Sequence, residues 1–229
     1  MSTIAENIAK VRARIREAAQ AFERNPETIG LLAVSKTRPA QDLREAHATG
    51  QRDFGENYLQ EALSKQAELA DLDLAWHFIG PIQSNKTRQI AEHFRWVHSV
   101  DRLKIALRLS EQRPPHLPPL NICLQVNVSG EASKSGCSPE ELPALARAVA
   151  QLPHLRLRGL MTIPEPNDDP QAQRLPLARL RQLRDTLDMD LDTLSMGMSQ
   201  DLEAAIAEGA TWVRIGTALF GARDYNRPD

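Results

Sequence analysis

Short apolar runs alternate with longer amphipathic segments along most of the chain. The runs are rich in branched residues and are bounded by polar or turn residues, a pattern typical of buried strands. We predict eight strands, at residues 29–35, 52–55, 76–79, 96–100, 120–128, 157–162, 193–196 and 212–215.

The amphipathic segments repeat their apolar residues at helical spacing. A first helix is predicted at residues 3–24, before the first strand. Further helices are predicted at residues 39–49, 58–69, 84–93, 102–112, 139–151, 171–187 and 200–208. Capping residues support two of them, because Ser138 and Glu141 begin one, and Ser199 and Gly209 bracket another.

Strands that alternate with helices predict parallel βαβ units. Eight of them favour a single-domain (β/α)8 TIM barrel over residues 1–229, with an extra N-terminal helix. Little of the chain follows the last strand, so we expect the leading helix to cover the wall that a final helix would normally cover. The alternative is an open doubly wound sheet, but "SKTRPA" lacks the GxGxxG motif of its dinucleotide-binding form.

Composition and charge exclude several classes of protein. The net charge is −2, which gives no electrostatic basis for binding nucleic acid or an anionic membrane. The N-terminal segment lacks the apolar core of a signal peptide, and no apolar run is long enough to span a bilayer. Cys123 and Cys137 have no CxxC or zinc-ligand spacing. We therefore expect a cytoplasmic, reduced and monomeric protein, with Cys123 buried and Cys137 a free thiol beside a turn.

One lysine stands apart from the others. Lys36 follows the uninterrupted apolar run "LLAVS", whereas Lys10, Lys65 and Lys104 lie in polar helical patterns and are expected to be solvated. In a barrel of this kind the chemistry lies at the C-terminal ends of the strands. Burying a charge is costly unless the charge is paired or given up. Lys36 is therefore either a strand-end lysine that extends to solvent or a chemically used amine.

The last two predicted strands end in small residues that suit a phosphate group. Gly197, Ser199, Gly216 and Thr217 lie where the loops after strands seven and eight of a TIM barrel commonly form such a site. Small residues allow backbone N–H groups to approach an anion. The alternative is that Ser199 only caps a helix and Gly216 only makes a tight turn.

Side-chain alternation places Lys36 and Arg214 on the inward faces of the first and last strands. These strands become neighbours when the barrel closes, so the two cations should lie side by side. Arg214 and desolvation would both lower the pKa of the lysine and leave a neutral amine. We therefore predict that Lys36 attacks a carbonyl and forms a Schiff base with an anionic ligand.

Other motifs carry less weight. "GPIQSNKT" resembles a nucleotide phosphate loop, but Asn85 occupies the position of the second required glycine. No paired histidine ligands are present, and His77 is expected to pack within a strand. No metal site is predicted.

Eight motifs, in order along essentially the whole chain, resemble the pyridoxal 5′-phosphate homeostasis (YggS/PROSC) family: "AVSKTRP", "DFGENYLQE", "WHFIGPIQSNKTR", "VHSVDR", "LQVNVSGEASKSG", "LRGLMTIP", "TLSMGMSQDLEAAI" and "VRIGTALFGARDY". The resemblance implies a barrel like the N-terminal domain of alanine racemase, with pyridoxal 5′-phosphate (PLP) as cofactor.

The resemblance also implies roles for individual residues. Lys36, in the "SK" motif, would be the cofactor lysine, and Asn57 would lie near the ring. Arg214 would face the pyridine nitrogen. Ser199, Gly216 and Thr217 would hold the phosphate. Arg38 departs from the lysine of many relatives, which leaves any secondary role of that position open.

Catalysis by PLP needs an electron sink and well-placed bases. Arg214 can only donate to the pyridine nitrogen, which weakens the sink. A racemase also needs a second base, which in alanine racemase is a tyrosine from another domain, and the tyrosines here are Tyr58 and Tyr225. We therefore expect a PLP carrier without catalytic turnover, which releases the cofactor to PLP-dependent apo-enzymes.

Two alternatives remain at the level of sequence. One is a residual PLP-dependent racemase or lyase that uses Tyr58 or a water as base. The other is a Schiff-base aldolase, although its lysine usually lies on a later strand. Lys134 in "EASKSG" could belong to a flap used in cofactor transfer or to an ordinary surface loop.

Overall fold

Eight parallel strands close into a barrel in the order of the sequence, as predicted. The computed structural model describes residues 2–130 and 135–222. The barrel closes where the first and last strands pair, with Gly30 opposite Trp212 and Leu32 opposite Arg214, so the open-sheet alternative is wrong. The strands are β1 (Gly30–Val34), β2 (Asp53–Glu56), β3 (Ala75–Phe78), β4 (Trp96–Val100), β5 (Leu120–Gln125), β6 (Leu155–Met161), β7 (Thr193–Ser195) and β8 (Trp212–Ile215).

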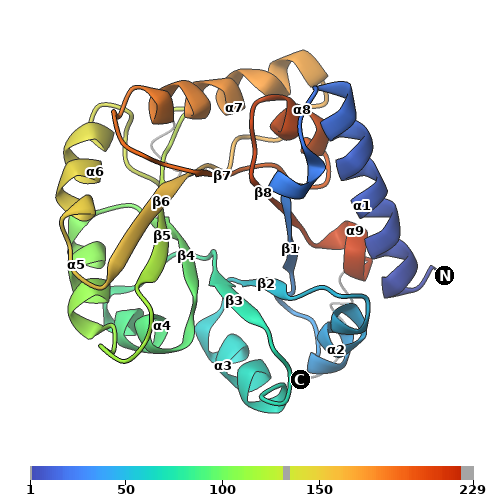
Figure 1. The fold of residues 1–229 in the computed structure, drawn as a ribbon, viewed down its shortest axis with the longest axis horizontal. Helices are drawn as coiled ribbons and strands as arrows, with labels where there is room; N and C mark the ends of the chain where they lie inside the picture. Colours follow the sequence, from blue (N-terminus) through green and yellow to red (C-terminus); the bar gives the residue numbers. More distant parts are fainter. Residues whose placement is uncertain (1, 131–134, 223–229) are drawn as a thin grey trace.

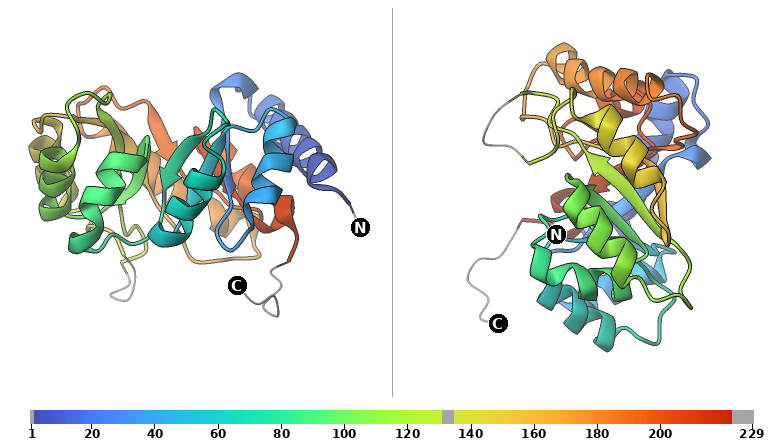
Figure 2. Two further views of the ribbon diagram at one scale, coloured as in Figure 1. Left: turned by 90° about the horizontal axis from the view of Figure 1, so that it is seen from below. Right: turned by 90° about the vertical axis from the view of Figure 1, so that its left-hand side faces the viewer.

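The helices lie outside the ring of strands (Figure 1), and the two side views show the same arrangement (Figure 2). They are α1 (Ile4–Ala21), α2 (Ala40–Ala48), α3 (Leu59–Glu68), α4 (Thr87–His93), α5 (Leu103–Gln112), α6 (Leu142–Ala150), α7 (Pro170–Asp185), α8 (Leu202–Ala207) and α9 (Thr217–Phe220). Two short 3-10 helices, η1 (Pro26–Thr28) and η2 (Ser84–Lys86), precede β1 and α4.

Helix α1 covers the wall between α8 and α2, as expected for the leading helix (Figure 1). Its buried residues recur every three or four positions and include Ile8, Val11 and Ile15. A capping box between Thr3 and Glu6 begins the helix.

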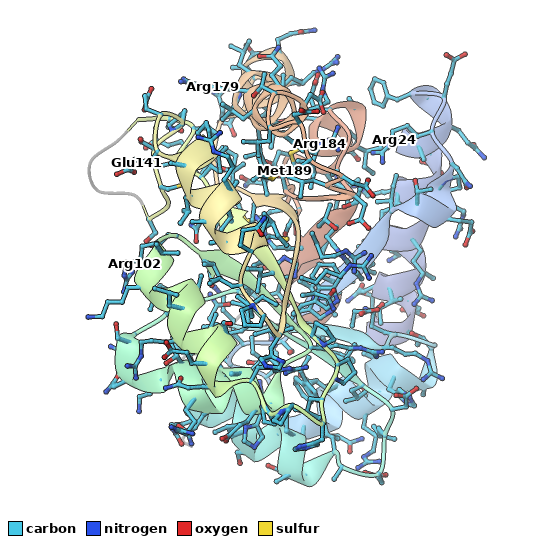
Figure 3. The ribbon with its side chains drawn as sticks, turned by 60° about the vertical axis from the view of Figure 1, so that its left-hand side comes forward. Arg24, Arg102, Glu141, Arg179, Arg184 and Met189 are labelled. Carbon is cyan, nitrogen blue, oxygen red and sulfur yellow. The ribbon has the colours of Figure 1, made fainter. Side chains whose placement is uncertain are left out.

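Arginines of the outer layer tie neighbouring helices and loops together. Arg24, after α1, donates to the carbonyl oxygen of Ile206 in α8 at 2.9 Å. Arg179, on α7, donates to the carbonyl oxygen of Val128 at 3.3 Å. Figure 3 shows Arg24, Arg179 and Arg184 on the outside of the molecule. Arg24 and Arg179 therefore connect helices and loops of the outer layer to one another.

Two predicted boundaries are wrong for local reasons. The strand predicted at 120–128 ends at Gln125, because the following backbone turns to pair with Cys137, whose N–H donates to the Gln125 carbonyl oxygen at 2.9 Å. The helix predicted at 200–208 begins at Leu202, and Asp201 rather than Ser199 is its N-cap residue. At the other end Gly209 has φ +99°, as a helix-terminating glycine requires.

The barrel interior is unusual for this fold. The main apolar core lies between strands and helices, whereas the inside of the barrel holds a small separate cluster of Trp96, Cys123 and Met161. The imidazole of His77 stacks on Trp96 with an interplanar angle of 2° and meets the edge of Trp212. Branched apolar side chains usually fill this layer of a TIM barrel. Here rings with polar nitrogen atoms occupy it.

Candidate functional site

A cavity of about 450 Å³ lies at the C-terminal ends of the strands. All six residues predicted for cofactor binding line it: Lys36, Asn57, Ser199, Arg214, Gly216 and Thr217. They come from β8, from α9 and from the loops after β1, β2, β7 and β8. The closed barrel therefore brings together residues that are far apart in the sequence.

Strand register explains why the two predicted cations share the cavity. Leu32 of β1 lies opposite Arg214 of β8, and Val34 lies against Gly216, whose missing Cβ would be 3.2 Å from the Val34 carbonyl oxygen. Lys36 follows two residues later, in a turn that the Arg38 N–H closes by donating to the Ser35 carbonyl oxygen at 3.1 Å. Val34, Lys36, Arg214 and Gly216 all line the cavity, which confirms their predicted inward direction.

The residue before Lys36 is fixed by buried polar groups. The Ser35 hydroxyl donates to Glu56 Oε1 at 2.6 Å, and the Ser35 carbonyl oxygen accepts from Lys65 Nζ at 2.7 Å. Lys65 also pairs with Glu56 Oε1 at 2.8 Å. Lys65 is only 4% exposed, so the expectation that it is a solvated surface charge is wrong.

The residue after Lys36 is fixed by the same group. The Thr37 N–H donates to Glu61 Oε1 at 2.6 Å, and that oxygen also accepts from Lys65 Nζ at 2.5 Å. Thr37 has φ +62°, a conformation that a β-branched residue rarely adopts without such support. We call Ser35, Glu56, Glu61 and Lys65 the Lys65 cluster. It anchors both residues that flank Lys36.

Burial raises the pKa of Glu56, and the nearby Lys65 opposes this rise. The glutamate is fully buried, and its Oε2 atom has no hydrogen-bond partner among the described residues. One sign of this cluster is visible in the sequence, since Glu61 and Lys65 are four residues apart on a helix. That spacing is typical of exposed pairs as well. The contact between Lys65 and Glu56 could be recognised only from the folded structure.

Arg214 is held rigidly beneath the cavity. It is 4% exposed, and it donates to Ser195 Oγ at 2.9 Å and to the Thr162 carbonyl oxygen at 2.8 Å. Burial lowers the pKa of Arg214 to about 10, so the guanidinium is protonated at neutral pH. It is therefore a fixed hydrogen-bond donor.

Glycine and serine shape the other side of the cavity. Gly197 has φ +98°, and a Cβ there would lie 2.5 Å from Ala205 Cβ, so no other residue fits without a shift. Ser199 does not cap α8, which removes the capping alternative, and Gly216 has φ −118° and makes no left-handed turn. Thr217 is exposed at the rim. This side offers small side chains and hydroxyl groups, as an anionic group requires.

Asn57 lines the cavity and carries a buried polar atom beside it. Its Oδ1 atom is buried and has no hydrogen-bond partner among the described residues. Gly80 fixes the adjoining backbone, because a Cβ there would lie 2.4 Å from the Asn57 carbonyl oxygen. Buried polar atoms are normally satisfied, so an orphaned amide oxygen in a cavity is consistent with a polar ligand.

The sequence did not reveal several other lining residues. The loop after β6, at residues 163–167, covers one side, and Met198 and Asp201 lie on another. The Asp201 Oδ1 atom accepts from the Met198 N–H at 2.6 Å. Arg38 lies at the rim and donates to the Gly221 and Ala222 carbonyl oxygens beyond α9. Arg38 thus fastens the chain beside the cavity.

The remaining expectations have separate outcomes. Tyr58 is 53% exposed and is not among the cavity-lining residues. Lys134 and Tyr225 lie outside the described residues. Cys123 and Cys137 are both buried and free, and burial raises the pKa of each thiol to about 12.

Neither a metal-binding cluster nor a membrane-spanning helix is present in the described residues. Residues 2–130 and 135–222 contain no group of three or more histidine, cysteine, aspartate or glutamate side chains that could hold a metal ion. Within the same ranges, none of the helices has the length and apolar character needed to cross a membrane.

Comparisons with known proteins give a consistent result. The family model described as "Alanine racemase, N-terminal domain" matches residues 2–224. The pyridoxal phosphate homeostasis protein of Pseudomonas aeruginosa is 79% identical, and the match covers 100% of this chain and 99% of that protein. The Escherichia coli protein of the same name is 54% identical over 99% of this chain and 100% of its own length.

A solved structure agrees with the sequence relatives. PipY from Synechococcus elongatus, determined with PLP bound, has a TM-score of 0.85 at 42% identity. The match covers 96% of this chain and 100% of that one.

Proposed function

The chain belongs to the alanine racemase N-terminal domain family and, within it, to the pyridoxal phosphate homeostasis proteins, and from this membership we propose that it binds PLP reversibly through Lys36. The observation that carries the proposal is the single cavity shared by Lys36 and the buried Arg214, in a fold whose relative PipY has PLP bound. The function is intracellular PLP homeostasis, carried out by a cytoplasmic monomer. Size-exclusion chromatography with light scattering tests the monomeric state.

Bound PLP supplies a reactive aldehyde, and the protein supplies the amine and the surroundings. The Lys65 cluster fixes the backbone on both sides of Lys36 and so limits where its amine can reach. Asn57, whose Oδ1 atom is buried and has no partner in the described part of the chain, would lie near the ring. Ser199, Gly216 and Thr217 hold the phosphate. These assignments rest on the cavity geometry and on the family resemblance.

Arg214 favours reversible binding of the cofactor over catalytic turnover. A protonated guanidinium can only donate hydrogen bonds, so with PLP in the cavity Arg214 would donate to the pyridine nitrogen, which would then carry no proton of its own. This weakens the electron sink that PLP catalysis uses. Tyr58, the tyrosine considered as a second base, is exposed and is not a lining residue. We therefore propose a carrier without catalytic turnover, from which PLP-dependent apo-enzymes take the cofactor.

Borohydride reduction of the PLP-loaded protein, followed by peptide mass spectrometry, tests the covalent site. The label should lie on Lys36, should be lost in Lys36→Ala, and should persist in Lys10→Ala, a change at an exposed lysine. A label on another lysine would refute the assignment. Incubation with amino acids in deuterated water tests turnover, and Cα exchange that depends on Lys36 would favour a racemase or lyase. Delivery fails if apo-enzymes gain activity no faster from the loaded protein than from free PLP.

A further inference from the structure

A line of hydrogen-bonded side chains runs through the inside of the barrel and ends on Arg214. At the end opposite the cavity, Asp53 Oδ1 lies 3.0 Å from His77 Nε2. His77 Nδ1 lies 2.9 Å from His98 Nε2, and His98 Nδ1 lies 2.7 Å from Ser195 Oγ. Ser195 Oγ then accepts from Arg214 at 2.9 Å. We call Asp53, His77, His98, Ser195 and Arg214 the axial network.

The chemistry of the two ends fixes the direction of every hydrogen bond between them. Arg214 can only donate, so Ser195 Oγ accepts from it and has its own proton available for His98 Nδ1. His98 then carries its proton on Nε2 and donates to His77 Nδ1. His77 carries its proton on Nε2 and donates to the Asp53 carboxylate, which only accepts.

Both imidazoles in the network are neutral at neutral pH. Desolvation lowers the pKa of His77 and lowers that of His98 well below its ordinary value, with His77 and Arg214 as further causes for His98. Asp53 opposes the shift at His77. Stacking on Trp96 fixes the His77 ring in the orientation that the hydrogen bonds require. A neutral imidazole has one donor and one acceptor, so a single direction satisfies both rings.

The far end of the network reaches water. The Asp53 side chain is 33% exposed, and it lines a second cavity of about 250 Å³ that is also lined by Arg12, Arg16 and Gln51. The near end lies beneath the PLP cavity, because Arg214 lines it. The network therefore connects a hydrated carboxylate at one end of the barrel with the guanidinium at the other.

We propose that Asp53 is a positioning residue for Arg214, which rests on the proposed function for its effect on the cofactor. The carboxylate selects the Nε2–H form of both histidines, so the Ser195 hydroxyl donates to His98 Nδ1 and turns a lone pair towards Arg214. This acceptor, together with the Thr162 carbonyl oxygen, orients the guanidinium towards the pyridine nitrogen. Without the carboxylate the histidines can adopt the opposite tautomers. His98 would then donate to Ser195 Oγ, and the Ser195 hydroxyl proton would lose His98 Nδ1 as its acceptor and turn elsewhere, which changes how the hydroxyl meets Arg214.

The tautomers can be measured on the protein without PLP, by two-bond ¹⁵N–¹H correlation spectra of ¹⁵N-histidine-labelled protein. We expect the Nε2–H form for both buried histidines and a mixture in Asp53→Asn, whose amide can donate as well as accept. Asp73→Asn is the matched control, because this acid is 84% exposed and lies near the same end of the barrel. A tautomer mixture in the wild type, or an unchanged His98 in Asp53→Asn, would overturn the inference.

The effect on the cofactor is measured by titrating PLP and recording its absorption band. Asp53→Asn should weaken binding by roughly tenfold, as expected when a charge-assisted hydrogen bond is loosened, and should shift the band. In a Ser195→Ala background, Asp53→Asn should not weaken PLP binding further, since the hydrogen bonds that join His98 to Arg214 through Ser195 are already absent. Equal affinities and spectra for wild type and Asp53→Asn would refute the positioning role. The histidine tautomers are measured without PLP, so they test the positioning role of Asp53 alone. The covalent label on Lys36 tests the proposed function, so failure of one can be told apart from failure of the other.

Discussion

Replacing Lys65 with methionine tests whether the buried cluster supports the strand end that carries Lys36. Methionine keeps most of the length and volume of the side chain and removes the charge. Glu56 Oε1 and the Ser35 carbonyl oxygen would lose a partner at 2.8 and 2.7 Å, and Glu61 would lose one at 2.5 Å. The change leaves a fully buried carboxylate without its cation.

The expected loss of stability is large. Removing one partner of a buried ion pair costs about 3–5 kcal/mol, because the remaining charge stays desolvated. Most of this loss comes from Glu56, since the Glu61 side chain is 29% exposed and water can replace its partner. For a chain of this size the loss corresponds to a decrease in Tm of roughly 6–20 °C. The variant should still fold, because domains of this kind have about 5–15 kcal/mol of stability.

The loss should also depend on pH. Lys65 opposes the burial that raises the pKa of Glu56, so the pKa of this carboxyl rises further in Lys65→Met. A raised pKa means that the folded state binds a proton more readily than the unfolded state, so stability falls as pH rises through that pKa. The deficit of the variant should therefore be smallest at acidic pH, where Glu56 binds a proton, and should grow as pH rises through the raised pKa of Glu56.

Urea unfolding at several pH values measures these effects. Lys104→Met, at an exposed lysine, is the control and should change stability by less than about 0.5 kcal/mol. Adding Glu56→Gln to Lys65→Met should recover stability, because it removes the uncompensated charge. A deficit below about 1 kcal/mol, or one that does not vary with pH, would refute the reasoning. PLP affinity should fall in Lys65→Met, since Ser35 and Lys36 lose their anchor.

Two further predictions concern the barrel itself. Burial lowers the pKa of His77 and His98, so the unfolded state binds more protons than the folded state below about pH 6.5. The free energy of unfolding, measured with urea, should therefore fall as pH drops, by up to about 1.4 kcal/mol per pH unit for each histidine. The slope should decrease in His98→Gln but not in His93→Gln, at an exposed position; equal slopes would contradict the assignment. Gly159→Ala should cost more than about 2 kcal/mol in thermal unfolding, because the new Cβ would lie 1.8 Å from the Thr193 carbonyl oxygen of the paired strand; a wild-type Tm would contradict this.

Strand periodicity and parallel topology made the fold predictable, and with it the place of Lys36 and Arg214 at one end of the barrel, whereas Asn57 was predicted from the family resemblance. Once eight parallel strands close into a barrel, β1 must pair with β8, as the register of Leu32 opposite Arg214 confirms. Lys36 and Arg214 must then lie at the same end of the barrel. The small residues after β7 and β8 followed from the same logic. These inferences needed only strand direction, strand order and side-chain alternation.

The two buried polar networks could not be predicted, because their bonds join elements that the sequence does not relate. Lys65 has the spacing of an ordinary surface lysine, and its burial depends on how α3 packs against β1 and β2. Packing of His77 within a strand was expected, but its bonds depend on the register between neighbouring strands. The β4–β5 pairing contains a register shift between Val97 and Val100, next to His98. Alternation along one strand does not reveal such a shift.

Polar side chains inside the barrel contribute less to stability than well-packed apolar side chains would. Replacing a complete buried polar network by well-packed apolar residues is often neutral or stabilising, whereas deleting one member is destabilising. Asp53, His77, His98 and Ser195 are therefore not explained by stability alone. What an apolar layer could not supply is an oriented acceptor for Arg214 beneath the cavity. The Lys65 cluster performs the corresponding task for the backbone of Lys36 from the outer wall. The barrel thus positions Lys36 and Arg214, which line the same cavity, by two separate buried networks.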